Sequence, residues 1–137
     1  MKNAYATLLS FIFILAGCKG DQVDVSSLKP AATRAVGNLT VVLLNKTGEL
    51  TQGQNDFIVE FKDNQGQPVD VGNVQIGSSM SMPGMAPMSG DSGVTKTKQT
   101  GIYRVTSNFA MSGAWHFALS WDGPAGQGQT AFISSVR

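Results

Sequence analysis

From residue 38 to the C-terminus, short runs of strand-forming residues alternate with turns rich in glycine, proline, asparagine and aspartate. The clearest run is 56-DFIVEFK-62, in which Phe57, Val59 and Phe61 share one face. No segment shows the 3.6-residue apolar period of an amphipathic helix. The strand candidates are residues 39–45, 56–62, 69–76, 93–98, 101–109, 114–121 and 129–136.

Seven short strands within residues 38–137 are typical of an all-β domain the size of an immunoglobulin-like β-sandwich. We therefore predict a sandwich of about seven short antiparallel strands, with a small barrel as the structural alternative. Trp115 and Trp121 fall on one face of the 114–121 strand, and the alternation predicts that they are buried. An exposed tryptophan pair would instead suggest stacking on sugar rings.

The first seventeen residues have the pattern of a secretory signal peptide. Lys2 precedes an apolar run, 8-LLSFIFILA-16, which is too short to span a bilayer. The run leads into 15-LAGC-18, which resembles the bacterial lipobox, so Cys18 is the predicted lipidation site. Cys18 is the only cysteine, so the folded domain can contain neither an intrachain disulfide nor a thiolate metal site.

The segment 18–37 is small and polar without an apolar period, so we predict a flexible tether from a lipidated Cys18 to the domain. The predicted location is the cell envelope, lipid-anchored on the periplasmic or other extracytoplasmic face. Lys19 weakly favours the outer membrane, because an aspartate there is typical of inner-membrane retention. Beyond Lys2, nine basic residues balance nine acidic ones, which argues against a nucleic-acid partner.

The segment 53-GQNDFIVEFKDNQGQPVDVGNVQI-76 resembles the first half of YtkA-like domains, a group related to the FixH family. The shared pattern is Asp-x-x-Gly-x-Pro-Val between two strands. The second half is also similar, with 101-GIY-103 and 109-FAMSGAW-115 following a methionine-rich stretch. The resemblance covers about residues 48–136 and implies an immunoglobulin-like β-sandwich. Because such domains accompany CusB-type heavy-metal efflux adaptors, it also implies metal handling in the envelope.

The stretch 78-SSMSMPGMAPM-88 concentrates methionines in a segment that has no periodic apolar face. Thioether sulfur is a soft ligand that suits Cu(I) or Ag(I) better than hard cations or zinc. Pro83-Gly84 predicts a turn that lets the later methionines fold back toward the earlier ones. The candidate ligands in this stretch are Met80, Met82, Met85 and Met88, with the first three expected to form the core of the site.

Two further residues are candidate ligands. Met111 precedes the strand that carries the tryptophans, and loops at one end of a sandwich cluster together. His116 is the only histidine, and the alternation places it on the face opposite Trp115, where an ordinary surface histidine is the simpler interpretation. The scarcity of histidine argues against a Cu(II) site, which prefers imidazole and oxygen ligands.

The sequence is compatible with two other roles for the methionines. Methionine fills irregular gaps, so the run could cap an open end of the sandwich, or it could form an adaptable surface for another protein. An enzyme is the least supported class, because no Gly-x-Ser-x-Gly motif is present and only His116 could act as a base. The expected partner is the membrane through the lipid, together with an envelope metal-efflux or cytochrome-assembly protein.

Overall fold

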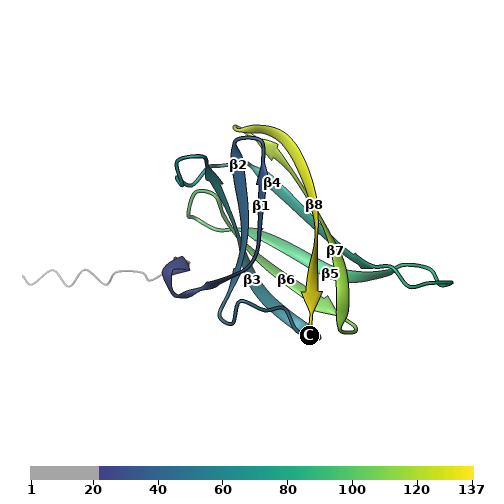
Figure 1. Ribbon diagram of the computed structural model, residues 1–137. Helices are drawn as coiled ribbons and strands as arrows, with labels where there is room; N and C mark the ends of the chain where they lie inside the picture. The colour runs from purple at the N-terminus through teal and green to yellow at the C-terminus, as the bar shows by residue number, and fades with distance from the viewer. Residues whose placement is uncertain (1–21) are drawn as a thin grey trace, which may run out of the picture.

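The computed structural model describes residues 22–137, so the predicted signal peptide (1–17) and Cys18 lie outside the described residues. One short 3₁₀ turn, Val25–Ser27, precedes eight β-strands. Every strand pairing is antiparallel, which confirms the predicted all-β sandwich class, with eight strands in place of about seven (Figure 1). The strands are β1 (Lys29–Val36), β2 (Leu39–Asn45), β3 (Gly53–Asp63), β4 (Asn73–Met80), β5 (Met88–Lys96), β6 (Ile102–Phe109), β7 (Gly113–Gly123) and β8 (Gly126–Val136).

The strands follow the order β1-β2-β3-β6-β5-β4-β7-β8 in one hydrogen-bonded sheet that folds over to form two layers. Strand β5 makes the crossing. Its residues 91–96 pair with β6 in one layer, whereas residues 88–90 pair with β4 in the other. Strands β1 and β8 lie at the two ends of this order, so each has one edge without a strand partner in the sheet.

The structure corrects the predicted tether, because β1 lies within the segment 18–37. Strand β1 pairs with β2 from Lys29↔Asn45 to Val36↔Leu39. An edge strand of a sandwich covers the core with one face only, and small residues such as Ala31 and Ala32 suffice for this contact. They are too weakly apolar to produce a recognisable period in the sequence.

The chain is already docked before β1 begins. Val23, Val25 and Leu28 pack on an outer cluster formed by Leu44, Ile58 and Ile102. The side-chain amide of Gln99 forms two hydrogen bonds with the backbone of Val23. It accepts one from the Val23 N–H (2.5 Å) and donates one to the Val23 carbonyl (3.2 Å). The prediction of a flexible tether is therefore wrong from residue 23 onward.

The core between the layers is built largely from aromatic and β-branched side chains. Trp115 and Trp121 are buried, which confirms the alternation in β7 and leaves no exposed tryptophan pair for stacking on sugars. The ring centroids of Phe109 and Trp115 are 5.1 Å apart, and those of Phe61 and Trp121 are 5.3 Å apart. Such tilted and edge-to-face pairs add to the stabilisation that comes from burying the rings.

Strands β4 and β5 both extend further toward the methionine stretch than the sequence predicts. Strand β4 begins at Asn73, after Gly72 with its positive φ of 75°, and ends at Met80. Strand β5 begins at Met88 in place of residue 93. Its sequence, MSGDSGVTK, has weak strand propensity, but pairing with strands on both sides holds it extended.

Candidate metal-binding site

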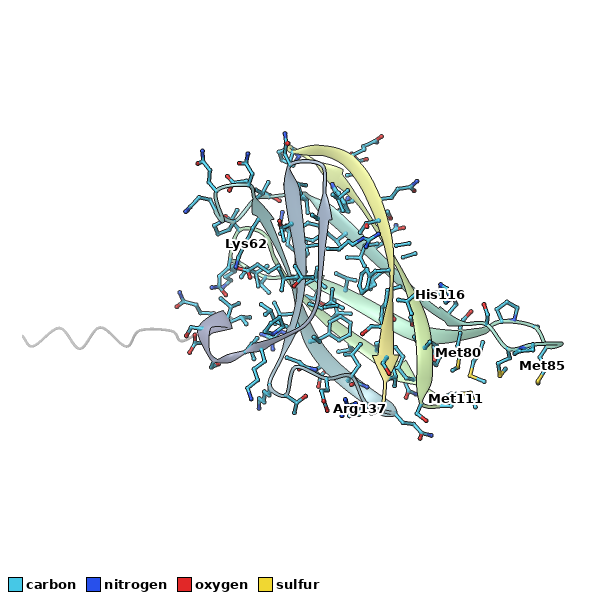
Figure 2. All side chains as sticks on the ribbon, viewed as in Figure 1. Lys62, Met80, Met85, Met111, His116 and Arg137 are labelled. Atoms are coloured by element: carbon cyan, nitrogen blue, oxygen red, sulfur yellow. The ribbon has the colours of Figure 1, made fainter. Side chains whose placement is uncertain are left out.

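The methionine stretch forms the end of a β-hairpin made by β4 and β5. Ser79 pairs with Ser89, and Met80 pairs directly with Met88. Side chains of directly opposed residues lie on the same face with Cβ atoms about 4.5–5.5 Å apart. The hairpin extends beyond the body of the sandwich, with Met80 near its base and Met85 at its tip (Figure 2).

The tip is a β-turn centred on Pro83-Gly84. The carbonyl of Met82 accepts a hydrogen bond from the N–H of Met85 at 3.2 Å, and Gly84 has a φ of 72°. Proline followed by a glycine of positive φ is the sequence of a type II turn, in which the first and fourth Cα atoms lie within about 7 Å. The predicted turn is therefore confirmed, and it brings Met82 and Met85 close to each other.

The base of the hairpin rests on the turn between β6 and β7. The methyl group of Met80 occupies the space that a side chain at Gly113 would take, and Gly113 has a φ of 137°. Met80 and Met88 are half-buried and pack against the core. Sequence reasoning missed the role of Gly113, although a glycine in the loop 109-FAMSGAW-115 was a signal that another chain segment approaches closely.

Met111 belongs to the same turn. Its carbonyl accepts a hydrogen bond from the indole N–H of Trp115 at 3.0 Å, which ties this turn to the core. The Met111 side chain is 37% exposed, and Figure 2 shows it on the side of the turn near Met80. Because Met80 contacts Gly113 and Met111 lies two residues before Gly113, the turn that carries Met111 adjoins the base of the hairpin.

His116 lies apart from these methionines. It is exposed, as the alternation in β7 predicts, and it pairs with Ser79 on one side and Ile133 on the other. Its side chain therefore shares the outer face with those two residues. Met80 follows Ser79 in β4 and faces the interior instead, because successive side chains of a strand point to opposite faces. The structure thus separates His116 from the base of the hairpin.

The methionines in the described part of the chain all gather at this end of the sandwich, and none belongs to the fully buried core. Met85 is 67% exposed. Methionine ordinarily fills gaps inside a protein, but here the interior is filled by aromatic and aliphatic residues. Only Met80 and Met88 combine partial packing on the core with a position in the hairpin.

The hairpin end itself carries no charge. Residues 78–90 contain no ionisable side chain. Beneath its base, a chain of serine hydroxyls joins three strands, with Ser78 and Ser92 at 3.4 Å and Ser92 and Ser107 at 2.7 Å. Within residues 22–137, no group of three His, Cys, Asp or Glu side chains is placed to hold a metal ion. The soft donor atoms at this end are the methionine thioethers.

The fold is that of a small β-sandwich domain, and a family model described as YtkA-like matches residues 33–120. The chain belongs to the YtkA-like family. No curated protein matches it. In the described residues, no helix has the length and apolarity needed to cross a membrane.

Two solved structures are similar in fold to the chain. The Lin-41 filamin domain is 14% identical, with a TM-score of 0.48, and the match covers 77% of this chain and 98% of that domain. The ZirS C-terminal domain is 10% identical, with a TM-score of 0.44, and the match covers 100% of this chain and 84% of that one.

Proposed function

We propose that this YtkA-like domain binds Cu(I) or Ag(I) through its methionine hairpin and passes the ion to or from another protein of the cell envelope. The observation that carries the proposal is the pairing of Met80 with Met88 at the base of a projecting hairpin, with Met82 and Met85 joined by a tight turn at its tip. The proposed role is binding and not catalysis.

The chemistry of the ligands favours a monovalent soft ion. Thioethers are neutral and soft, and residues 78–90 contain no carboxylate of the kind on which Mg²⁺ and Ca²⁺ sites rely. We assign the ligands as two neighbouring sets. Met80, Met88 and Met111 form the set at the base, and Met82 and Met85 form the set at the tip. His116 is not included, because it faces the other side of the sheet.

The position of the hairpin supports a role in transfer. At its tip Met85 is exposed and Met82 is half-buried, so a donor or acceptor protein could contact the bound ion directly. The Val25–Ser27 turn lies on the side of the domain away from the hairpin (Figure 1). If Cys18 is lipidated, the membrane anchor is attached on that side and the hairpin is directed away from the bilayer. Partners would then be envelope metal-efflux or cytochrome-assembly proteins.

A second candidate function is a metal-free interaction module whose hairpin contacts a partner protein. The observation that favours it is the 67% exposure of Met85 at the tip of a projecting, uncharged hairpin. Exposed methionines adapt their shape to varied apolar surfaces. Metal binding requires the sulfur atom of methionine, whereas contact with an apolar partner surface does not.

A competition titration with Cu(I) against a chromogenic chelator tests the proposal. Residues 22–137 contain both core clusters and lack Cys18, so this domain is suitable for the experiment. We expect binding tighter than about micromolar, and we expect it to be lost when Met80, Met82 and Met85 are replaced by leucine. Leucine keeps nearly the same apolar volume while removing sulfur, so the fold and an apolar partner contact survive.

His116→Asn is the matched control, because it removes a metal-binding side chain from the outer face and should leave the affinity unchanged. Separate Met82→Leu/Met85→Leu and Met80→Leu/Met88→Leu variants assign the ion to the tip or to the base. Wild-type binding weaker than micromolar would refute metal binding and leave the interaction module as the remaining candidate.

A further inference from the structure

The two free edges of the sheet differ in how they are protected against pairing with other strands. Strand β1 carries Pro30, a register shift between Pro30 and Ala32, and the charged residues Lys29 and Arg34. Proline, bulges and charges are the features by which proteins keep edge strands from pairing with other chains. The edge at β1 is thus blocked in several ways at once.

Strand β8 has none of this protection. It is 11 residues long, from Gly126 to Val136, and contains neither a charge nor a proline. Its pairing with β7 is regular from Gly113↔Val136 to Gly123↔Gly126, without a register shift. Ile133 is 62% exposed and is one of the few large hydrophobic side chains exposed in the described residues. An open depression of about 600 Å³, lined by residues 31–34 and 131–135, separates β8 from β1.

The unpaired backbone groups of β8 can be identified from its last contacts. Arg137 donates its N–H to the carbonyl of Leu50 (2.9 Å), and its carbonyl accepts from the N–H of Gln52 (2.6 Å), so these groups point away from β7. The pointing direction alternates along an antiparallel strand. The N–H groups of residues 129, 131, 133 and 135 therefore also point to the open edge.

We propose that β8 pairs in antiparallel fashion with β8 of a second copy of this chain, which joins two domains through a continuous sheet. An antiparallel strand pair of identical chains has two-fold symmetry, so the same surface serves both partners. Since β8 is uncharged, the symmetric pairing sets no like charges against each other. The segment 50–52 already covers the strand end, which limits the pairing to residues 129–135.

The register follows from the side chains. With the two-fold axis at Phe132, Ile133 lies opposite Ala131 of the second copy. Both of these residues point their N–H groups to the open edge, so the two strands can form backbone hydrogen bonds with each other. This arrangement covers the exposed side chain of Ile133 on the outer face. It also sets Phe132, which is half-buried against the core, beside its symmetry mate.

Analytical ultracentrifugation of residues 22–137 over a range of concentrations tests the pairing. We expect a reversible monomer–dimer equilibrium for the wild type and at least about a tenfold weaker dimer for Ile133→Lys. Ile133 is exposed in the single domain, so this change should not affect folding. Ala131→Pro should weaken the dimer similarly, because it removes an outward-pointing N–H that β7 does not use. Thr106→Lys, at an exposed position on β6 in the other layer, is the control and should leave the dimer intact.

A charge pair tests the register. Ala131→Lys and Ile133→Glu should each weaken the dimer, and the double variant should restore it, because Lys then faces Glu across the two-fold axis. Failure of the double variant to recover would overturn the register at Phe132. A wild type that stays monomeric, forms open-ended aggregates, or dimerises equally well with Ile133→Lys would overturn the proposal. The result does not depend on metal binding, because the methionine hairpin is unchanged in all these variants.

Discussion

The two ends of the β4–β5 ribbon are held in opposite ways. At one end, the Lys96 ammonium pairs with Asp70 at 2.8 Å, and the Tyr103 hydroxyl donates to the carbonyl of Gly72 at 2.8 Å. At the other end, the strands continue into an uncharged turn carrying thioethers. Directional polar contacts hold the first end in one arrangement. The second end carries methionine side chains, which adapt their shape and whose sulfur atoms can act as soft metal ligands.

The difference shows that the methionines of the hairpin do not all serve stability. The polar end anchors the loop before β4 to the body of the sandwich, and burial raises the pKa of Tyr103, which keeps its hydroxyl protonated as a donor. The methionine end has a base that packs on the core and a tip that does not. On the β4 side of the hairpin, we expect Met80 to contribute to the stability of the fold and Met82 not to.

The largest effect is expected at the base of the hairpin. Gly113→Ala should destabilise the domain by about 2 kcal/mol or more, because the new methyl group displaces Met80 and the positive φ is strained for any other residue. Urea unfolding measures the change. Met80→Ala in the same background should recover part of the loss by relieving the contact. Gly77→Ala is the control, because space is open there and no effect of this size is expected. Equal effects at both glycines would contradict the packing described for Met80.

At the polar end, Tyr103→Phe should cost about 1 kcal/mol, the usual net value of a buried hydrogen bond. The ring of Tyr103 still packs edge-to-face on Phe61, with centroids 5.6 Å apart, so the loss isolates the hydroxyl. A change below a few tenths of a kcal/mol would show that the carbonyl of Gly72 is equally well satisfied by water.

At the tip, replacement of Met82 and Met85 by serine should change the free energy of unfolding by less than about 0.5 kcal/mol, the range usual for surface substitutions. The turn is retained through Pro83-Gly84 and its backbone hydrogen bond. The same variant should lose metal affinity if the tip binds the ion. A destabilisation above about 2 kcal/mol would show that the tip caps the core and would remove the contrast between the two ends.

The strand alternation was sufficient to predict most of the fold. Residues 39–45 form β2 as expected, and in β7 the alternation placed Trp115 inside and His116 outside correctly. Strand β1 was missed because an edge strand needs little apolar surface, and its alanines resemble a linker. Met80 and Met88 fall outside the strands predicted at 69–76 and 93–98, because their strand conformation comes from pairing with other strands.

For the candidate site, the sequence predicted the turn at Pro83-Gly84 and the return of Met88 toward Met80, and the structure confirms both. It could not predict that His116 faces away from Met80, because this depends on the register between β4 and β7. Nor could it predict the contact of Met80 with Gly113, which is set by how the two layers cross. The methionines in the sequence thus indicated a soft-metal ligand chemistry. Which of these residues lie together at one site is decided by the pairing of the strands.

The smallest effect should come from the Lys96–Asp70 pair, since both side chains are exposed and solvent screens their attraction. The hydrogen bond from Lys96 lowers the pKa of Asp70 below its ordinary 3.8 in the folded state. Its contribution is therefore present above that value and is lost as the pH falls through the folded pKa. The pKa of Lys96 is raised above 10.5, mainly by the same hydrogen bond, so the contribution is also lost as the pH rises through that folded pKa.

Urea midpoints of the wild type and Lys96→Met should differ slightly near pH 7 and converge near pH 2. Adding salt at neutral pH should reduce the same difference. If the difference in urea midpoint persists at low pH, the effect comes from packing of the lysine side chain and not from its charge. The polar end would then be held by apolar contacts, as the base of the methionine hairpin is.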